Sequence, residues 1–183
     1  MRGVAFVLAM VSLGAGTARA QQTYGTGGPY DPAVPSPRVA LGYEIGDRFT
    51  PHYQMSRYLE RLAATSRRVR LDTMGRTFEG RELLLVVVTS EANQARLDQI
   101  RADAARLADP RGASPAELAA LTARVPATVW LAYTVHGNEG SGTEAALALA
   151  YQLAAGQDAE TRAILDSCVV LIDPLQNPDG HER

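Results

Sequence analysis

The 183-residue sequence contains no lysine, one cysteine and three histidines, and only 6% of its residues are aromatic. All 18 basic residues are therefore arginines, which excludes a lysine nucleophile, a Schiff-base lysine and a P-loop lysine within these residues. The single cysteine, Cys168, cannot form an intramolecular disulfide, and its apolar surroundings favour a small packed side chain over a nucleophile. Several enzyme classes and a disulfide-stapled fold are thus excluded.

An excess of charge of one sign is also missing. Eighteen basic residues stand against 20 acidic ones and leave a net charge of −2, so the chain has no global field for nucleic acid or an anionic membrane. No nucleic-acid partner is expected. Hydrophobic residues make up 46% of the chain and charged residues 21%, which is typical of an ordinary globular protein.

Residues 1–20 have the pattern of an export signal. Arg2 supplies the positive start, residues 4–13 form a short apolar core, and residues 18–20 (Ala-Arg-Ala) give a small-x-small cleavage pattern. The apolar run is too short to span a bilayer comfortably, so no membrane span is expected. The sequence predicts a cleaved signal peptide and a secreted or periplasmic protein.

Residues 21–40 are rich in glycine and proline and poor in apolar residues, which predicts a flexible linker. Beyond it, apolar residues recur at three- and four-residue steps over residues 54–64, as on the buried face of a helix. Residues 41–183 are therefore predicted to form the folded domain.

The expected fold class is α/β. Four stretches have the composition of strands, namely residues 69–74, 83–89, 128–135 and 169–173. Residues 142–155 predict a helix between the last two, and apolar strands separated by a helix favour a parallel βαβ unit. We expect a mixed, mainly parallel sheet flanked by helices on both faces, with residues 91–124 as an inserted pair of amphipathic helices that carries no chemistry.

His136-Gly137-Asn138-Glu139 follow the expected strand at its carboxyl end, where ligands bind in open α/β sheets. This segment places an imidazole and a carboxylate three residues apart, at a glycine-containing turn into a helix. Zinc accepts such a pair at distances of about 2.0 to 2.2 Å, with a third protein ligand from elsewhere and one open position. A surface turn with a capping pair is the alternative. His136 and Glu139 are the candidate metal ligands.

Two further carboxylates, Glu144 and Asp173, are weaker candidates for a role in this site. Glu144 is a rival ligand, but residues 141–144 have the spacing of a capping box, which predicts a structural role. Asp173 ends the last strand and could accept a hydrogen bond from the other ring nitrogen of His136, which would orient that ring. A strand-terminal aspartate that caps the following turn is the alternative.

Residues 177–180 (Asn-Pro-Asp-Gly) have the composition of a type I turn. A plain turn explains them fully, and their possible function rests on their place beside residues 136–139 at the same sheet edge. His181 follows directly and is predicted to be an exposed loop residue, and His52 is also predicted not to bind metal.

Three segments together resemble the zinc carboxypeptidase family of the carboxypeptidase A type. Residues 75–83 (GRTFEGREL) look like its N-terminal hairpin, residues 136–139 match its first metal-binding motif, and residues 177–180 match the turn after its next strand. The resemblance covers roughly residues 53–183. The helical segment 91–124 looks like an insertion relative to the smallest members.

The resemblance implies one zinc ion with His136 and Glu139 as two of its ligands, and hydrolysis of the C-terminal bond of a peptide or protein. In such a site zinc polarises the scissile carbonyl and acidifies water, while a carboxylate moves the proton to the leaving amine. The family's third ligand, its general-base glutamate and its substrate-binding arginines come later than residue 183, and Arg183 itself is not assigned to them. The chain is therefore expected to be a truncated N-terminal part of the catalytic domain, inactive alone and without a catalytic residue of its own.

Two other functions remain open. Acylases and amidases of the aspartoacylase type also use an H-x-x-E pair, although residues 75–83 and 177–180 favour the carboxypeptidase side. The chain could also belong to a non-catalytic exported binding domain that kept the fold without the metal. The downstream sequence would discriminate all three.

Overall fold

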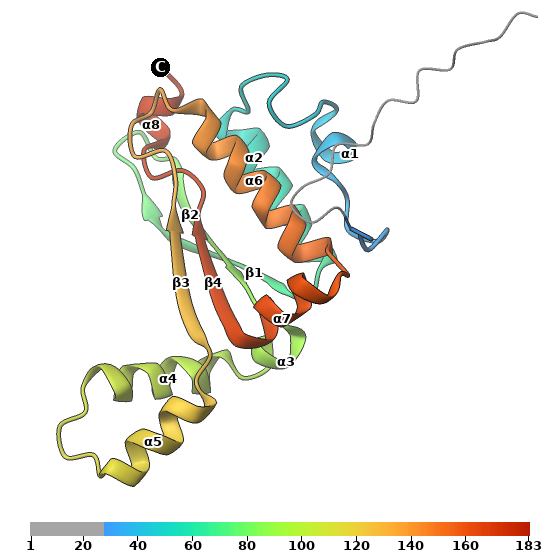
Figure 1. The fold of residues 1–183 in the computed structure, drawn as a ribbon. Helices are drawn as coiled ribbons and strands as arrows, with labels where there is room; N and C mark the ends of the chain where they lie inside the picture. Colours follow the sequence, from blue (N-terminus) through green and yellow to red (C-terminus); the bar gives the residue numbers. More distant parts are fainter. Residues whose placement is uncertain (1–27) are drawn as a thin grey trace, which may run out of the picture.

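Four strands form one mixed sheet in the order β1-β2-β4-β3 (Figure 1). The structure is a computed structural model that describes residues 28–183. The predicted export signal, residues 1–20, and the first part of the predicted linker lie outside the described residues. The strands are β1 (Val69–Arg76), β2 (Glu82–Val88), β3 (Ala127–Ala132) and β4 (Cys168–Asp173).

The strand pairing confirms the mixed α/β class. β1 and β2 form an antiparallel hairpin, as predicted. β3 and β4 pair in parallel, and α6 lies between them in the chain, so the predicted βαβ unit is present. β2 also pairs antiparallel with β4. Among the four described strands, only β3 and β4 therefore pair in parallel. The pairings of β1 with β2 and of β2 with β4 are antiparallel.

Eight helices lie within residues 28–183. They are α1 (Pro37–Leu41), α2 (His52–Thr65), α3 (Glu91–Gln94), α4 (Leu97–Ala108), α5 (Pro115–Arg124), α6 (Gly140–Ala155), α7 (Ala159–Ser167) and α8 (Pro178–His181). None of them is long and apolar enough to cross a membrane.

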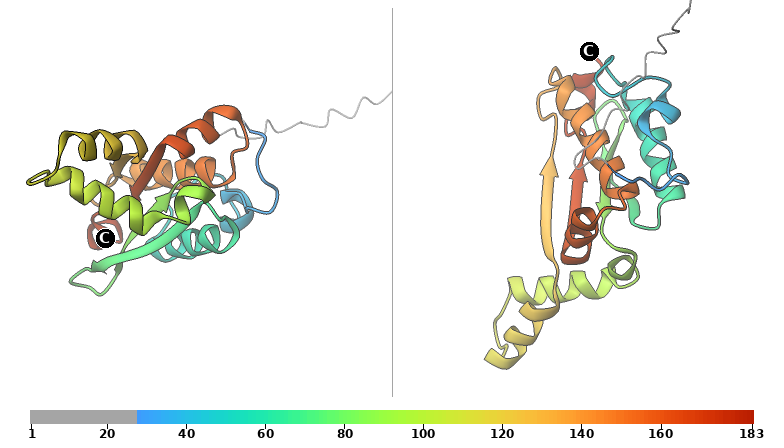
Figure 2. Two further views of the ribbon diagram at one scale, coloured as in Figure 1. Left: turned by 90° about the horizontal axis from the view of Figure 1, so that it is seen from below. Right: turned by 45° about the vertical axis from the view of Figure 1, so that its right-hand side comes forward.

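The main core lies between the sheet and helices α2 and α6 (Figure 2). Helix α2 buries the apolar face that its periodicity predicted, and α6 is buried along most of its length. Full burial of one such side chain contributes about 1.5 to 3 kcal/mol. The residues that meet here include Met55, Leu59 and Leu62 of α2, Val86 and Val88 of β2, Leu147 of α6 and Ile172 of β4.

The opposite sheet face is covered only in part. Ile100 of α4 packs there against Val87 and Val169, whereas Trp130 of β3 remains 59% exposed. Helices α4 and α5 are the predicted pair of helices, and they lie at the end of the sheet away from α8 (Figure 1). The buried carboxylate of Asp103 joins them by accepting two hydrogen bonds of 2.8 Å from the Arg124 guanidinium.

The predicted linker is wrong over its described part, residues 28–40. The ring of Tyr30 packs on that of Tyr151 at 5.0 Å, the Asp31 N–H donates to the carbonyl of Ala155 at 2.7 Å, and Val34 is only 3% exposed. Glycine and proline dominate the composition of this segment, but a few apolar side chains suffice to attach it to the core. The folded domain therefore begins before Leu41.

Candidate metal site

The carboxyl ends of β3 and β4 continue side by side beyond the sheet. The Tyr133 N–H donates to the carbonyl of Asp173 at 2.9 Å, and the Gln176 N–H returns a bond to the Tyr133 carbonyl at 3.1 Å. The Asn177 N–H then donates to the carbonyl of Thr134 at 3.3 Å. β3 ends at Ala132, three residues earlier than predicted, and Thr134 has a positive φ of 51°. These bonds bring residues 136–139, the His136 turn, next to residues 177–180, the Asn177 turn.

The two turns touch through their glycines. A Cβ atom added to Gly137 would lie 2.0 Å from the carbonyl carbon of Gly180, a distance that no side-chain atom tolerates. Glycine at position 137 is thus required by the close approach of another backbone segment. The sequence placed both motifs at the same sheet edge, and the structure brings their backbones into contact.

His136 and Glu139 face each other at this edge. Nδ1 of His136 lies 3.0 Å from Oε1 of Glu139, and the His136 N–H donates to Oε2 at 3.2 Å. The hydrogen bonds from the ring and the N–H of His136 hold the pKa of Glu139 below its usual value. The side chains are 75% and 49% exposed, so both remain accessible from solvent.

This pair fits the requirements of a zinc site. Two ligand atoms on a tetrahedral zinc ion lie about 3.3 Å apart when each is about 2.05 Å from the metal, close to the observed separation of 3.0 Å. An imidazole nitrogen and a carboxylate oxygen are also the donors that zinc accepts. Within residues 28–183, no three histidine, cysteine, aspartate or glutamate side chains are grouped closely enough to hold a metal. The described residues therefore offer one pair of candidate ligands, His136 and Glu139, and no third.

The expected capping box at residues 141–144 is wrong. Helix α6 begins at Gly140, and Glu144 lies on its second turn, where Oε1 accepts a 2.8 Å hydrogen bond from the N–H of Thr50. Glu144 is only 8% exposed, and its Oε2 has no hydrogen-bond partner among the described residues. Its role is structural, as predicted, but it anchors a distant loop and does not cap α6.

Asp173 does not contact His136, whose ring faces Glu139. The carboxylate of Asp173 is 5% exposed and its Oδ1 has no partner among the described residues. Burial raises the pKa of Asp173, although hydrogen bonds from Gln176 and from the Leu175 N–H oppose this shift. Asp173 thus marks the end of β4 without orienting the His136 ring.

The ring nitrogens of the other two histidines face backbone carbonyls and not the side chains of His136 and Glu139. His181, which was predicted to be an exposed loop residue, is only 4% exposed, because α8 folds it back under the His136 turn. Nε2 of His52 lies 2.8 Å from the carbonyl of Glu82, so this ring attaches α2 to the start of β2.

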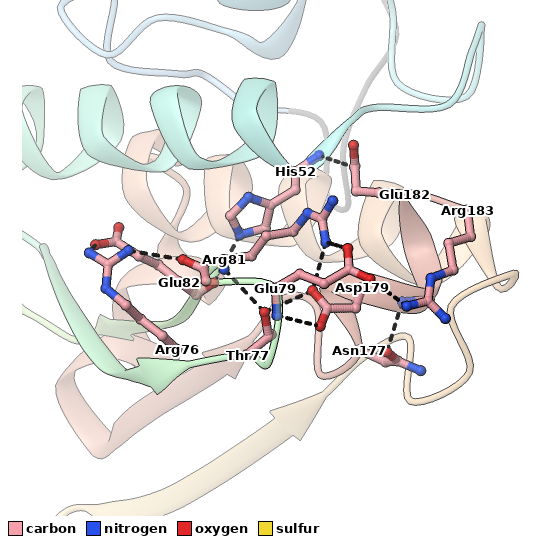
Figure 3. Close-up of polar contacts among 12 residues, drawn as sticks. His52, Arg76, Thr77, Glu79, Arg81, Glu82, Asn177, Asp179, Glu182 and Arg183 are labelled. Carbon is pink, nitrogen blue, oxygen red and sulfur yellow. Dashed lines mark hydrogen bonds and ion pairs between the residues drawn. The ribbon is translucent and has the colours of Figure 1, made fainter.

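The sequence did not reveal a polar network between the β1–β2 hairpin and the Asn177 turn (Figure 3). Oδ1 of Asp179 accepts hydrogen bonds of 2.7 Å from Thr77 Oγ1 and from the Arg81 guanidinium, and Oδ2 accepts one from the Glu79 N–H. The carboxylate of Glu79 in turn pairs with Arg81 and Arg183. The available signal in the sequence was the opposite charge of Arg81 in residues 75–83 and Asp179 in residues 177–180, which could have predicted an ion pair between the two segments. The network fixes the hairpin loop against the turn that supports His136.

Asp179 should make this contact dependent on pH. Burial opposes ionisation of its carboxylate, but the bonds from Thr77, Arg81 and the Glu79 N–H outweigh burial and lower its pKa. A depressed pKa in the folded state contributes stability above the unfolded-state pKa and loses it as pH falls through the folded-state value. Asp179→Asn should therefore lower the melting temperature by a few degrees at pH 7, and the difference from wild type should shrink towards pH 3. Thermal unfolding across that pH range measures it, and a constant difference would refute the explanation.

These observations define a class of protein, namely an α/β domain with two exposed side chains of the kind that bind zinc, an imidazole and a carboxylate, at the carboxyl end of a parallel strand. A family model for zinc carboxypeptidases matches residues 55–183. The chain therefore belongs to the zinc carboxypeptidase family, a family of hydrolases that use zinc and act on peptides or proteins. No curated protein sequence matches the chain.

One solved structure supports the fold. Carboxypeptidase A from Helicoverpa armigera matches 74% of this chain with a TM-score of 0.53 and 19% identity. A carboxypeptidase A-like protein from Shewanella denitrificans matches 72% of the chain with a TM-score of 0.41 and 24% identity. The matched parts amount to 26% and 27% of those two proteins, so the chain spans about a quarter of their length.

Proposed function

We propose that the chain is the N-terminal part of an exported zinc carboxypeptidase that releases C-terminal residues from peptides or proteins. The observation that carries the proposal is the His136–Glu139 pair, separated by 3.0 Å and open to solvent at the carboxyl end of β3. Membership of the zinc carboxypeptidase family supports the assignment.

His136 and Glu139 would hold one zinc ion through Nδ1 and a carboxylate oxygen. When bound, zinc supplies Lewis-acid activation of a peptide carbonyl and of water. The chain's own contribution is to hold the two ligand side chains at a fixed separation. The hydrogen bonds between the β3 and β4 ends and the contact of Gly137 with Gly180 provide that rigidity. We place the third ligand and the general-base glutamate beyond residue 183.

The experiment that tests this function compares substrates in the full-length protein. Peptides with a free C-terminus should lose their last residue in the presence of zinc, and a chelator should stop the reaction. The same peptides with an amidated C-terminus should react much more slowly, because a carboxypeptidase recognises the free carboxylate. Preferential hydrolysis of N-acyl amino acids would instead favour the acylase alternative, and zinc binding without hydrolysis of either class would favour a binding domain.

Export gives an independent prediction. Residues 1–20 should be absent from the mature protein, because the Ala-Arg-Ala pattern follows a short apolar core. N-terminal sequencing of protein recovered outside the cytoplasm should begin at Gln21. Recovery of a chain that begins at Met1 would contradict cleavage.

A further inference from the structure

His181 is a buried histidine beneath the His136 turn. Its Nδ1 lies 3.3 Å from the carbonyl oxygen of Gly137, and its Nε2 lies 3.1 Å from the carbonyl oxygen of Thr50. The ring also stacks on Phe49, with centroids 4.0 Å apart and planes inclined by 25°. Stacking on Phe49 therefore fixes the plane of the ring, and because both carbonyl oxygens only accept, a neutral ring donates to one of the two.

The loop on the far side of this ring is itself attached to α6. The N–H of Thr50 donates to the buried carboxylate of Glu144, while the carbonyl of the same residue faces His181. The ring of Phe49 lies against Gly140, where an added Cβ atom would be 3.2 Å from it. The Phe49–Thr50 loop, α6 and α8 thus converge on one point under the His136 turn.

The carbonyl of Gly137 is the critical acceptor at that point. It belongs to the peptide unit between residues 137 and 138, in the middle of the turn that separates His136 from Glu139. A carbonyl oxygen only accepts hydrogen bonds, so a bond to Gly137 requires the proton on Nδ1 of His181. Restraining this peptide unit restrains the relative position of the two side chains on either side of it.

We propose that His181 is a positioning residue, which donates from Nδ1 to the Gly137 carbonyl and thereby holds His136 and Glu139 at metal-binding separation. The proposal rests on the proposed zinc-binding function of that pair. Residues that orient metal ligands from outside the coordination shell typically change metal affinity by about 10- to 100-fold when they are replaced. His181 would act on the ligands through the backbone of the turn.

Three variants of the full-length protein separate this role from packing. His181→Phe keeps an aromatic ring on Phe49 and removes both ring nitrogens, including the donor to Gly137. His181→Asn places an amide donor near the Nδ1 position and loses the contact with Thr50. His52→Phe is the matched control, because it removes a ring contact with the Glu82 carbonyl at the start of β2 and leaves the His52 N–H free to keep its hydrogen bond to Glu182.

Zinc affinity is the first readout, measured by competition with a chelator on folded protein. His181→Phe should bind zinc about 10- to 100-fold more weakly than wild type, His181→Asn should recover most of that loss, and His52→Phe should match wild type. A purely structural role would lower the melting temperature without this pattern. Wild-type affinity in folded His181→Phe, or no recovery in His181→Asn, would overturn the proposal.

Hydrogen exchange of the metal-free protein distinguishes failure of the proposal from failure of the zinc function. The backbone amides of residues 138 and 139 should exchange faster in His181→Phe than in wild type or His52→Phe. If wild type bound no zinc, the proposed function would fail, and this measurement would still decide whether His181 restrains the turn. Equal exchange rates in all three proteins would overturn the restraint.

Discussion

Replacing His136 with alanine in the full-length protein should remove zinc and peptide hydrolysis together and leave the fold intact. An open zinc site has only three protein ligands, so the loss of one removes a large share of the coordination. The loss of affinity should exceed the factor of about 10 to 100 that loss of an outer partner costs. The side chain of His136 is 75% exposed and contacts Glu139, so little packing is lost.

Elemental analysis of the dialysed variant measures the zinc content, and thermal unfolding checks the fold. His52→Ala is a suitable control, because it removes a histidine whose ring contacts a backbone carbonyl at the start of β2. The control should retain zinc and activity. Full zinc occupancy in His136→Ala would show that His136 is not a ligand.

The 183-residue chain made by itself should not hydrolyse peptides. Residues 28–183 contain the proposed pair of ligands and no group of three, so a zinc ion would be held by half of its coordination shell. A positioned general base contributes about 10² to 10⁴ in rate, and we place that residue beyond residue 183. The substrate-binding arginines that the family resemblance implies are also expected there.

Solubility of the isolated chain should be poor as well. β3 is an edge strand of the described sheet, it carries no charged residue, and Val129 and Trp130 on it are 37% and 59% exposed. Exposed apolar edge strands promote association between chains. The assay uses purified 183-residue chain with added zinc, on peptides with free and blocked C-termini, beside the full-length protein. Zinc-dependent release of C-terminal residues by the short chain would place the third ligand and the base within these residues.

Local sequence patterns predicted the elements that carry their own signal. The buried face of α2 follows from the spacing of apolar residues, the β1–β2 hairpin from a short connection with two glycines, and the parallel β3–β4 pair from two apolar strands separated by a helix. The position of the His136 turn followed from its place after an apolar strand. These features depend on residues close together in the chain, which is why a single sequence suffices to predict them.

Features that depend on distant contacts were missed or assigned wrongly. Glu144 has the spacing of a capping residue but bonds to Thr50, which lies 94 residues away in the chain. His181 follows a turn motif and is nevertheless buried, because its partners come from the loop before α2 and from the His136 turn. No periodicity encodes such contacts, since each depends on how separate segments pack.

A crystal structure of the full-length protein with zinc, with anomalous diffraction recorded at the zinc absorption edge, tests the central assignment most directly. The anomalous peak should lie within bonding distance of Nδ1 of His136 and of a carboxylate oxygen of Glu139, about 2.0 to 2.2 Å from each. A zinc peak held by other residues, with His136 and Glu139 still paired to each other, would contradict the account.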